Sequence, residues 1–284
     1  MRQRATATAE AGTVSPLRRR GEDESIDERY MIPGLSRGLA LLQLFTRDRP
    51  EQRLSEIADG LGLSRSATYR LAYTLEKDGF LYRDPVSRSF SLTSKVLSLG
   101  FAFLHDQPLT DLAQPFLRAA SDAARSASHL VVLERWEAVY LARVSPQVAL
   151  VSNIPVGTRL PAHVAASGRA LLAGLDDQHL RAIYGLLQGE CRTVAVPPTF
   201  EKFRAATAAD RRRGYVYQAS RFNPSLVSFA CAVRNRTGAV VAAINVVIPE
   251  TLADEAGGEA ALRAIMLDAS AGLSRRLGYG EGRV

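Results

Sequence analysis

The chain has 284 residues, of which 46% are hydrophobic and 23% charged, and its formal net charge is +7. This length exceeds the roughly 100 to 150 residues of a typical domain, so we expect two cores. No apolar run approaches the roughly 20 residues of a membrane span, and the N-terminus lacks the apolar core of a secretory signal. The cysteines, Cys191 and Cys231, are too few for a disulfide framework or a zinc site. These features favour a soluble protein of the reducing cytoplasm.

The basic residues are spread along the chain. The first 100 residues hold 16 Lys and Arg against 13 Asp and Glu, so much of the excess lies further on. Bulk charge therefore does not identify a nucleic-acid partner, and that interpretation depends on local motifs. Residues 1–30 show no sustained apolar period and are predicted to form a disordered tail. Its cluster Arg18, Arg19 and Arg20 is interpreted as a solvated charge run rather than a site.

Three helices are predicted after this tail. Apolar residues from Leu35 to Phe45 recur at three- and four-residue spacing, as on one face of an amphipathic helix. The run LSEIADGLG predicts a brief second helix with Ser55 as its cap, and Gly62 allows a tight turn. Ser64 is then expected to cap a third helix, with an inward stripe that includes Ala67, Leu71 and Leu75.

A short hairpin follows the third helix. FLYRD and RSFSLT are β-type runs, and Asp84-Pro85-Val86-Ser87 between them is a plausible loop. This order of elements, a helix, a short helix, a turn, a third helix and a hairpin, is typical of a winged helix-turn-helix, which we predict over residues 31–95. Residues 96–109 are predicted to form a linker helix, with a break near Pro108.

Residues 110–280 are predicted to form a second domain. Apolar runs such as HLVVLE, AVYLARV and VVAAINVVI alternate with helical runs such as SGRALLAGL. This mixture favours an α+β fold with a largely antiparallel sheet. Cys231 lies in a run of small apolar residues and is predicted to belong to the core.

The start of the third helix carries residue types that suit DNA. In a helix-turn-helix this end of the second helix enters the major groove, where Arg matches guanine and hydroxyls reach phosphates or bases. No acidic residue lies between Ser64 and Leu75 to repel phosphates. Two arginines of the hairpin could meet backbone or minor groove. The predicted DNA-binding residues are Ser64, Arg65, Ser66, Thr68, Tyr69, Arg70, Arg83 and Arg88. The alternative is a helical protein-interaction module with a solvated face.

A family resemblance is carried by the runs LSEIADGLGLSRSATYRLAYTLEKDGFLYRD, VGTRLPAHVAASGRALLAGL and RRRGYVYQASRFNPSLVSFACAVRN. Over roughly residues 33–280 the chain resembles the isocitrate lyase regulator (IclR) family of transcription regulators. Within that family VGTRLPA is most similar to the protocatechuate and p-hydroxybenzoate regulators. The resemblance implies a double-stranded DNA operator, a GAF-like effector domain, and a homodimer or tetramer. It also implies an effector related to aromatic acids, since a helix start after GTRLPAHVAA suits a carboxylate.

The resemblance also implies where the effector binds. The residues that match are Ala165, Ala166, Ser167, Gly168, Gln218, Ser220, Ser228, Asn245 and Val247. Where acidic residues commonly follow GY in the family, this chain has QASRFNPS, which removes like-charge repulsion and favours an anionic effector. Arg159 and Arg221 are near in sequence, and whether they contribute or merely face solvent stays open.

Two other classes of function are weighed. An enzyme would need a nucleophile beside a base, and His163 with Ser167 is the only suggestive pair, without a nucleophile elbow. A constitutive DNA-binding protein with a degenerate sensor would explain the unusual QASRFNPS. No phosphate loop, metal spacing or dinucleotide fingerprint is present, so we expect no catalysis, cofactor or metal. Whether the protein represses or activates is not encoded in these motifs.

Overall fold

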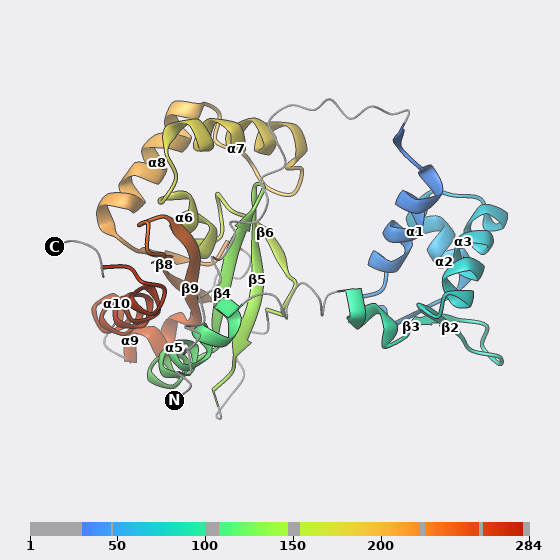
Figure 1. The fold of residues 1–284 in the computed structure, drawn as a ribbon, viewed down its shortest axis with the longest axis horizontal. Coiled ribbons are helices and arrows are strands. Elements are labelled where there is room, and N and C mark those ends of the chain that lie inside the picture. The colour runs from blue at the N-terminus through green and yellow to red at the C-terminus, as the bar shows by residue number, and fades with distance from the viewer. Residues whose placement is uncertain are drawn as a thin grey trace, which may run out of the picture. The chain divides into compact units, whose positions relative to one another are not determined.

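A computed structural model describes residues 30–46, 48–99, 108–146, 154–221, 225–255 and 258–280. The described residues divide into two compact units, 30–99 and 108–280. Figure 1 labels their helices and strands. The predicted tail, up to residue 29, and most of the predicted linker helix lie outside the described residues. None of the described helices is long and apolar enough to cross a membrane.

The first unit is the predicted winged helix-turn-helix. Its three strands pair antiparallel in the order β1-β3-β2, and β1, which packs beside the wing, was not predicted from the sequence. The elements are α1 (Pro33–Gln43), β1 (Glu51–Gln52), α2 (Leu54–Leu61), α3 (Arg65–Lys77), β2 (Leu81–Arg83) and β3 (Phe90–Leu92). Residues 95–99 continue as the start of a helix.

Local capping explains where α2 and α3 begin. Ser64 caps α3 as predicted, since its Oγ accepts a hydrogen bond from the backbone N–H of Ala67 at 3.3 Å. Ser55, however, does not cap α2, because the helix already begins at Leu54 and its N-cap lies two residues before Ser55. The N-cap is Arg53, whose backbone N–H donates to the Glu56 carboxylate at 2.6 Å. This bond, from the N-cap N–H to the side chain three residues on, is the one that a glutamate makes in a capping box.

The buried side of α1 differs from the predicted stripe. Leu41 is fully buried and Phe45 nearly so, and both join the small core of this unit. Leu35 and Leu39, which the periodicity placed on the same face, are 61% and 50% exposed. The three- and four-residue spacing is real, but only the C-terminal part of α1 packs against α2 and α3 in this unit.

The second unit is a six-stranded antiparallel sheet in the order β6-β5-β4-β9-β8-β7. The strands are β4 (Ser128–Glu134), β5 (Glu137–Val144), β6 (Arg159–Pro161), β7 (Val216–Ala219), β8 (Leu226–Arg234) and β9 (Val240–Pro249). The helices are α5 (Pro108–Ala124), α6 (Ala166–Leu172), α7 (Asp177–Glu190), α8 (Phe200–Arg213), α9 (Glu250–Glu255) and α10 (Gly258–Arg276). This mixed α+β architecture agrees with the predicted fold class.

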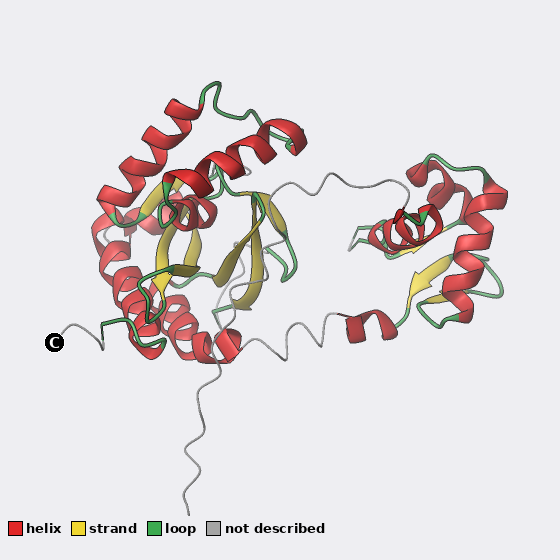
Figure 2. Ribbon diagram, turned by 45° about the horizontal axis from the view of Figure 1, so that its top comes forward, coloured by secondary structure: helices red, strands yellow, loops and turns green. Residues whose placement is uncertain are grey.

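Helices cover both faces of the sheet, as Figures 1 and 2 show. On one face α5 and α10 bury the larger apolar core, which includes Cys231 as predicted. Burial raises the pKa of the Cys231 thiol to about 12. On the other face α6 packs directly on the strands, and α7 and α8 form a further core with it. The described part of α5 begins at Pro108, and the segment before it, where a break was predicted, lies outside the described residues.

Candidate functional site

The outward face of α3 gathers most of the predicted DNA-binding residues. Ser64, Arg65, Ser66, Tyr69 and Arg70 are all exposed, and no acidic residue interrupts them. Residues three and four apart lie on one side of a helix, so these side chains form a continuous surface. Its two guanidinium groups can reach phosphates or guanine edges.

Thr68 does not belong to this surface, and its prediction as a DNA contact is wrong for this structure. The side chain is fully buried, and its hydroxyl donates to the Ser64 carbonyl at 3.0 Å. Together with Ala72 it forms the inward side of α3. Of the predicted inward stripe, Leu71 and Leu75 do pack against the core, although they are only partly buried, and Thr68 and Ala72 lie deeper.

Two residues of the same surface were missed from the sequence. Tyr73 is 46% exposed, and its ring centroid lies 6.1 Å from that of Tyr69. The Lys77 ammonium lies over the Tyr73 ring at 5.2 Å from its centroid. Arg65, Tyr69, Tyr73 and Lys77 therefore form one row at four-residue spacing. The four-residue spacing is visible in the sequence, but only residues in the first turns of the helix were predicted to contact DNA.

The wing holds its two arginines differently. Arg88 is exposed at the hairpin loop with φ of +61°. Arg83 is partly buried, and its guanidinium lies 5.8 Å from the Tyr69 ring and 5.4 Å from the Phe90 ring. Arg83 thus links the wing to α3 through its cation–π contact with Tyr69, while its contact with Phe90 lies within the wing. This packing makes Arg88 the freer of the two predicted DNA contacts in the wing.

Asp84 organises the hairpin loop between β2 and β3. Its Oδ1 accepts hydrogen bonds from the backbone N–H groups of Ser87 at 2.6 Å and Val86 at 2.9 Å, and from the Ser87 hydroxyl at 2.9 Å. Hydrogen bonds from Ser87 lower the pKa of Asp84 below its ordinary value of 3.8. An ionised aspartate therefore shapes the loop that carries Arg88.

The predicted effector-binding positions share one side of the second unit. Ser228, Asn245 and Val247 alternate with strand residues that point into the α5 and α10 core, so they face α6. Gln218 and Ser220 follow the same alternation on and after β7. Ala165, Ala166, Ser167 and Gly168 lie where α6 begins, and all four are buried. We call this side, with the start of α6, the α6 face.

The start of α6 is in close contact with the chain before it. A Cβ on Gly168 would lie 2.4 Å from the Cα and the carbonyl oxygen of Ala162, so no other residue fits without a backbone shift. Ala165 is the N-cap and offers no side-chain cap. With only seven residues, α6 has a small macrodipole, so the helix-terminus argument for a carboxylate is weaker than the sequence suggested.

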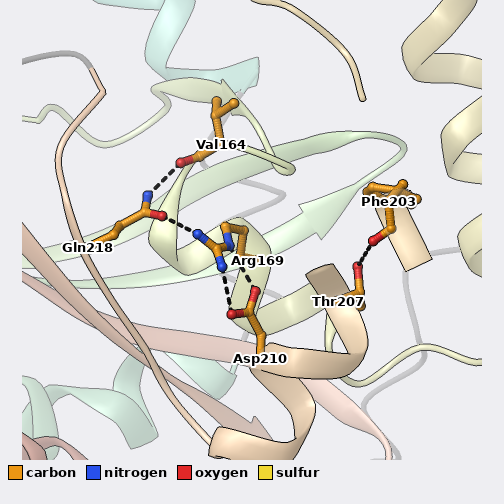
Figure 3. A network of polar contacts seen from close by, with 6 residues as sticks. All are labelled: Val164, Arg169, Phe203, Thr207, Asp210 and Gln218. Carbon is orange, nitrogen blue, oxygen red and sulfur yellow. Dashed lines mark hydrogen bonds and ion pairs between the residues drawn. The ribbon is translucent and has the colours of Figure 1, made fainter. Parts of the chain in front are cut away.

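Gln218 is engaged by the protein itself (Figure 3). Its Nε2 donates to the Val164 carbonyl at 2.7 Å, and its Oε1 accepts from the Arg169 guanidinium. Arg169 also donates two hydrogen bonds, of 2.8 and 2.7 Å, to the carboxylate of Asp210. This network ties β7, α6 and α8 together, so Gln218 positions the α6 face rather than presenting a free amide to it.

A further group of polar residues on the α6 face was not found from the sequence. His129, Tyr140 and Asn245 are at most 3% exposed. The rings of His129 and Tyr140 are edge to face with centroids 5.3 Å apart, and the Tyr140 hydroxyl lies 3.5 Å from Ser167 Oγ. His129 and Asn245 are direct cross-strand partners on β4 and β9. The run HLVVLE was interpreted only as an apolar strand, so its first residue, His129, was not considered as a functional group.

Several side chains considered for anion binding or catalysis point elsewhere. Arg159 pairs with Glu137 at 2.8 Å and with Glu134 at 2.9 Å, so its charge is compensated at the edge of the sheet. Arg221 is exposed. His163 Nε2 contacts the Ala195 carbonyl at 3.1 Å, whereas Ser167 contacts Tyr140. His163 and Ser167 thus do not form a nucleophile–base pair here.

Family models match both units. The IclR helix-turn-helix domain matches residues 34–85, and the bacterial transcriptional regulator IclR C-terminal domain matches residues 101–275. The chain belongs to the IclR family of transcriptional regulators. Its relatives are named as regulators, repressors or activators of transcription rather than as enzymes.

Two of the relatives carry names that match the predicted subgroup. The Pca regulon regulatory protein of Pseudomonas putida is 34% identical over 76% of this chain and 74% of its own length. The p-hydroxybenzoate hydroxylase transcriptional activator of Acinetobacter baylyi is 32% identical over 78% of this chain and 83% of its own length. Both agree with the subgroup that VGTRLPA indicated.

Solved structures show the same fold. A transcriptional regulator from Rhodococcus sp. RHA1 is 28% identical, with a TM-score of 0.70 over 87% of this chain and 98% of that one. An IclR homologue from Microbacterium hydrocarbonoxydans, solved in complex with 4-hydroxybenzoate, is 24% identical, with a TM-score of 0.71 over 86% and 98%. The latter likeness concerns the fold alone.

Proposed function

We propose that this IclR-family regulator binds a double-stranded DNA operator through α3 and the wing, and that a small anionic aromatic acid bound at the α6 face changes its operator affinity. Such a protein acts in the cytoplasm, where the DNA is. The ligand can alter DNA affinity only by binding one arrangement of the protein better than another, and the coupling is reciprocal.

The observation that carries DNA binding is the acid-free, exposed surface of α3. Among the described residues Arg65 and Arg70 form no ion pair, and no carboxylate neighbours them on this surface, so their charges are available to phosphates. Ser66, Tyr69 and the missed Tyr73 add hydrogen-bonding and stacking groups. The wing contributes Arg88.

We propose a dimer, which can pair further into a tetramer. One recognition helix reads few base pairs, so specific binding to a near-palindromic operator usually takes two. Apolar side chains exposed at and before α1 supply a surface that a second copy can cover. They are Tyr30, Met31, Ile32, Leu35 and Leu39. This role would explain why the N-terminal half of α1 keeps an apolar stripe that its own unit does not bury.

The anionic aromatic effector is supported by two observations. Two relatives above 30% identity are named for the Pca regulon and for p-hydroxybenzoate hydroxylase. In addition, Asp210, the carboxylate in the network beside the α6 face, is paired with Arg169, and Gln218 is neutral. These groups therefore present no unpaired negative charge that would repel an anion.

Two rivals make different predictions. A metabolite-binding protein or enzyme that used its helix-turn-helix for protein contacts would not show salt-sensitive, sequence-selective DNA binding. A constitutive DNA-binding protein with a degenerate sensor would bind DNA but respond to no ligand. The relatives' names favour a regulator over the first rival, and a measured ligand response would exclude the second.

The test combines DNA and ligand binding. Operator sequences are selected from random duplexes, and their affinity for the wild type, Arg70→Ala and Arg118→Ala is measured by fluorescence anisotropy at several salt concentrations. We expect Arg70→Ala to weaken binding roughly tenfold or more, whereas Arg118→Ala, an exposed change in α5, leaves it unchanged. Equal affinity of Arg70→Ala and wild type would contradict the assignment of α3.

The ligand half uses 4-hydroxybenzoate and other small aromatic acids. We expect a saturable rise in melting temperature and an altered operator affinity at the same concentrations. Intact DNA binding with no response to any of these acids would favour the constitutive rival. Ser167→Tyr should fill the α6 face and abolish the ligand response, so unchanged effector affinity by calorimetry would refute this location.

A further inference from the structure

A hollow lies on the surface of the second unit, where α5 and α10 pack side by side (Figure 1). Its volume is about 400 Å³, and it is lined by Phe116 of α5 and by Gly272, Arg275 and Arg276 of α10. Pockets of roughly 300 to 1,000 Å³ hold small molecules, so this one has room for a single ring with a substituent. Because α5 and α10 cover the sheet face opposite α6, the hollow is separate from the α6 face. We call it the α5–α10 hollow.

Phe116 and Gly272 form the apolar part of the hollow. Both residues are half-buried, and Phe116 packs against the core beneath α5 and α10. A Cβ on Gly272 would lie 2.5 Å from a ring carbon of Phe116, so any side chain at this position would displace the ring. The glycine therefore lets the Phe116 ring lie directly against the backbone of α10. A ring held in this way offers an apolar surface on which a second aromatic ring can pack.

The two arginines supply positive charge beside this ring. Arg275 and Arg276 belong to the last turn of α10 and are both exposed. Neither side chain forms an ion pair or a hydrogen bond with the part of the chain that the structure describes, and none of the four lining residues is acidic. In the same unit Arg159 and Arg169 are, by contrast, paired with carboxylates. The planar guanidinium group matches a carboxylate through two parallel hydrogen bonds, so this end of the hollow suits an organic acid.

The backbone at the end of α10 opposes an anion only weakly. A helix C-terminus carries roughly half a negative charge, on carbonyl groups that lack partners. Here the chain turns back, so that the Ser274 carbonyl accepts from the Tyr279 N–H at 2.9 Å and the Arg275 carbonyl from the Gly278 N–H at 2.9 Å. Two full positive charges therefore outweigh the partial negative charge of the helix end.

We propose that the α5–α10 hollow is a second ligand site, which binds a small aromatic carboxylate separately from the α6 face. The ring of the acid packs on Phe116, and its carboxylate binds Arg275 and Arg276. A bare inorganic anion would leave the Phe116 ring uncovered, and a neutral ring would leave the arginines without a counter-charge. A protein partner would need far more surface than four residues offer, since stable interfaces bury about 800 Å² on each side. This site does not depend on the proposed function of the α6 face.

The experiment is a titration of 4-fluorobenzoate with the full-length protein, followed by fluorine NMR. In the variant Ser167→Tyr, the α6 face is filled and only the hollow remains. We expect this variant still to bind 4-fluorobenzoate saturably, with weaker affinity than the wild type because the hollow is open to solvent. The neutral analogue 4-fluorobenzamide keeps the ring but loses the charge, so it should bind roughly tenfold more weakly.

A double substitution tests the two arginines against a matched control. Added to Ser167→Tyr, the pair Arg275→Gln with Arg276→Gln should weaken binding of 4-fluorobenzoate roughly tenfold or more, because it removes both charge-assisted contacts. The control pair Arg118→Gln with Arg125→Gln causes the same change in net charge at exposed positions in and after α5 that do not line the hollow. It should leave the affinity unchanged.

A second measurement avoids the substitution of the buried Ser167. By isothermal titration calorimetry, the otherwise wild-type protein should bind two molecules of 4-fluorobenzoate per chain, and the Arg275→Gln with Arg276→Gln pair only one. Since both arginines are exposed and unpaired in the described structure, this pair should melt at the wild-type temperature.

The two sites can fail separately. If Ser167→Tyr abolishes all saturable binding while the arginine pair has no effect, the α6 face is the ligand site and the hollow is refuted. If the control pair weakens binding as much as the arginine pair, the acid responds to general charge and the hollow is equally refuted. If only the arginine pair lowers the affinity and Ser167→Tyr does not, the hollow stands and the proposed effector location falls.

Discussion

The two units place their candidate functional residues in opposite environments. On α3 the side chains offered to DNA are exposed, and the core beneath them is made by other residues such as Thr68 and Ala72. On the α6 face the candidates are themselves buried between the sheet and a helix. We therefore expect a substitution on the α3 surface to weaken the proposed DNA binding without unfolding, whereas a substitution on the α6 face should change both the proposed effector binding and the stability of the second unit.

The largest expected effect comes from the most crowded point of the α6 face. Gly168→Ala places a Cβ 2.4 Å from the backbone of Ala162, which cannot move aside as a flexible side chain would. We expect this variant to destabilise the second unit by about 3 kcal/mol. Thermal unfolding followed by circular dichroism measures the loss.

Gly185→Ala provides the matched control within the same unit. Gly185 lies inside α7, and an added Cβ meets nothing within 4 Å. Because alanine is the better helix former, this variant should be as stable as the wild type or gain about 0.5 to 1 kcal/mol. Equal melting temperatures for the two variants would show that the start of α6 is not closely packed. The contrast between the exposed α3 surface and the buried α6 face would then fail.

The second-largest loss of stability is expected from the hydrogen-bond network of Arg169, Asp210 and Gln218 beside the α6 face. Asp210→Ala removes the carboxylate that accepts two hydrogen bonds from Arg169, whose guanidinium then lacks its charged partner. Asp210 is 5% exposed, so we expect a loss of about 2 kcal/mol, less than for a fully buried pair because Arg169 is partly exposed. Urea unfolding gives this value.

Asp177→Ala is the corresponding change in an exposed ion pair. Asp177 accepts from Arg204 at 2.8 Å, and both side chains are more than half exposed. Such pairs contribute at most about 1 kcal/mol. If Asp177→Ala cost as much as Asp210→Ala, burial would not distinguish the network from an ordinary surface pair.

The sequence predicted the elements of both units better than the environment of single residues. Periodicity and caps located α3 and its N-cap Ser64 because both are local features. The same periodicity placed Leu35 and Leu39 inside, since a helix pattern does not tell which neighbour covers it. The strand β1 has only two residues, too few to show any alternation.

The candidate effector site could be predicted only in part. The resemblance supplied Ser228, Asn245 and Val247, and strand alternation does place them on one face. His129 and Tyr140 were missed because their meeting depends on the pairing of β4 with β5 and β9, which no local pattern encodes. The Arg169–Asp210 pair joins residues 41 positions apart, so it too required the fold.

A smaller effect tests the corrected role of Thr68. Thr68→Val keeps the shape of the buried side chain and removes only a hydroxyl that donates to Ser64. We expect stability to change by less than about 1 kcal/mol and operator affinity to remain at the wild-type value. A tenfold loss of operator affinity in a variant of normal stability would restore Thr68 as a DNA contact.

The smallest effect is confined to the wing and to acidic pH. The pKa of Asp84 is lowered in the folded protein, so its carboxylate stabilises the loop fully above the unfolded value of 3.8, and this contribution is lost as pH falls through the still lower folded pKa. Amide chemical shifts of Val86 and Ser87, followed by NMR, should therefore titrate together with a midpoint below 3.8. Asp84→Asn should remove this titration, because an amide carbonyl accepts the same hydrogen bonds without a charge to lose. A midpoint at or above 3.8 would mean that the wing loop is not shaped by the ionised aspartate, and that Arg88 owes its position to the β2–β3 hairpin alone.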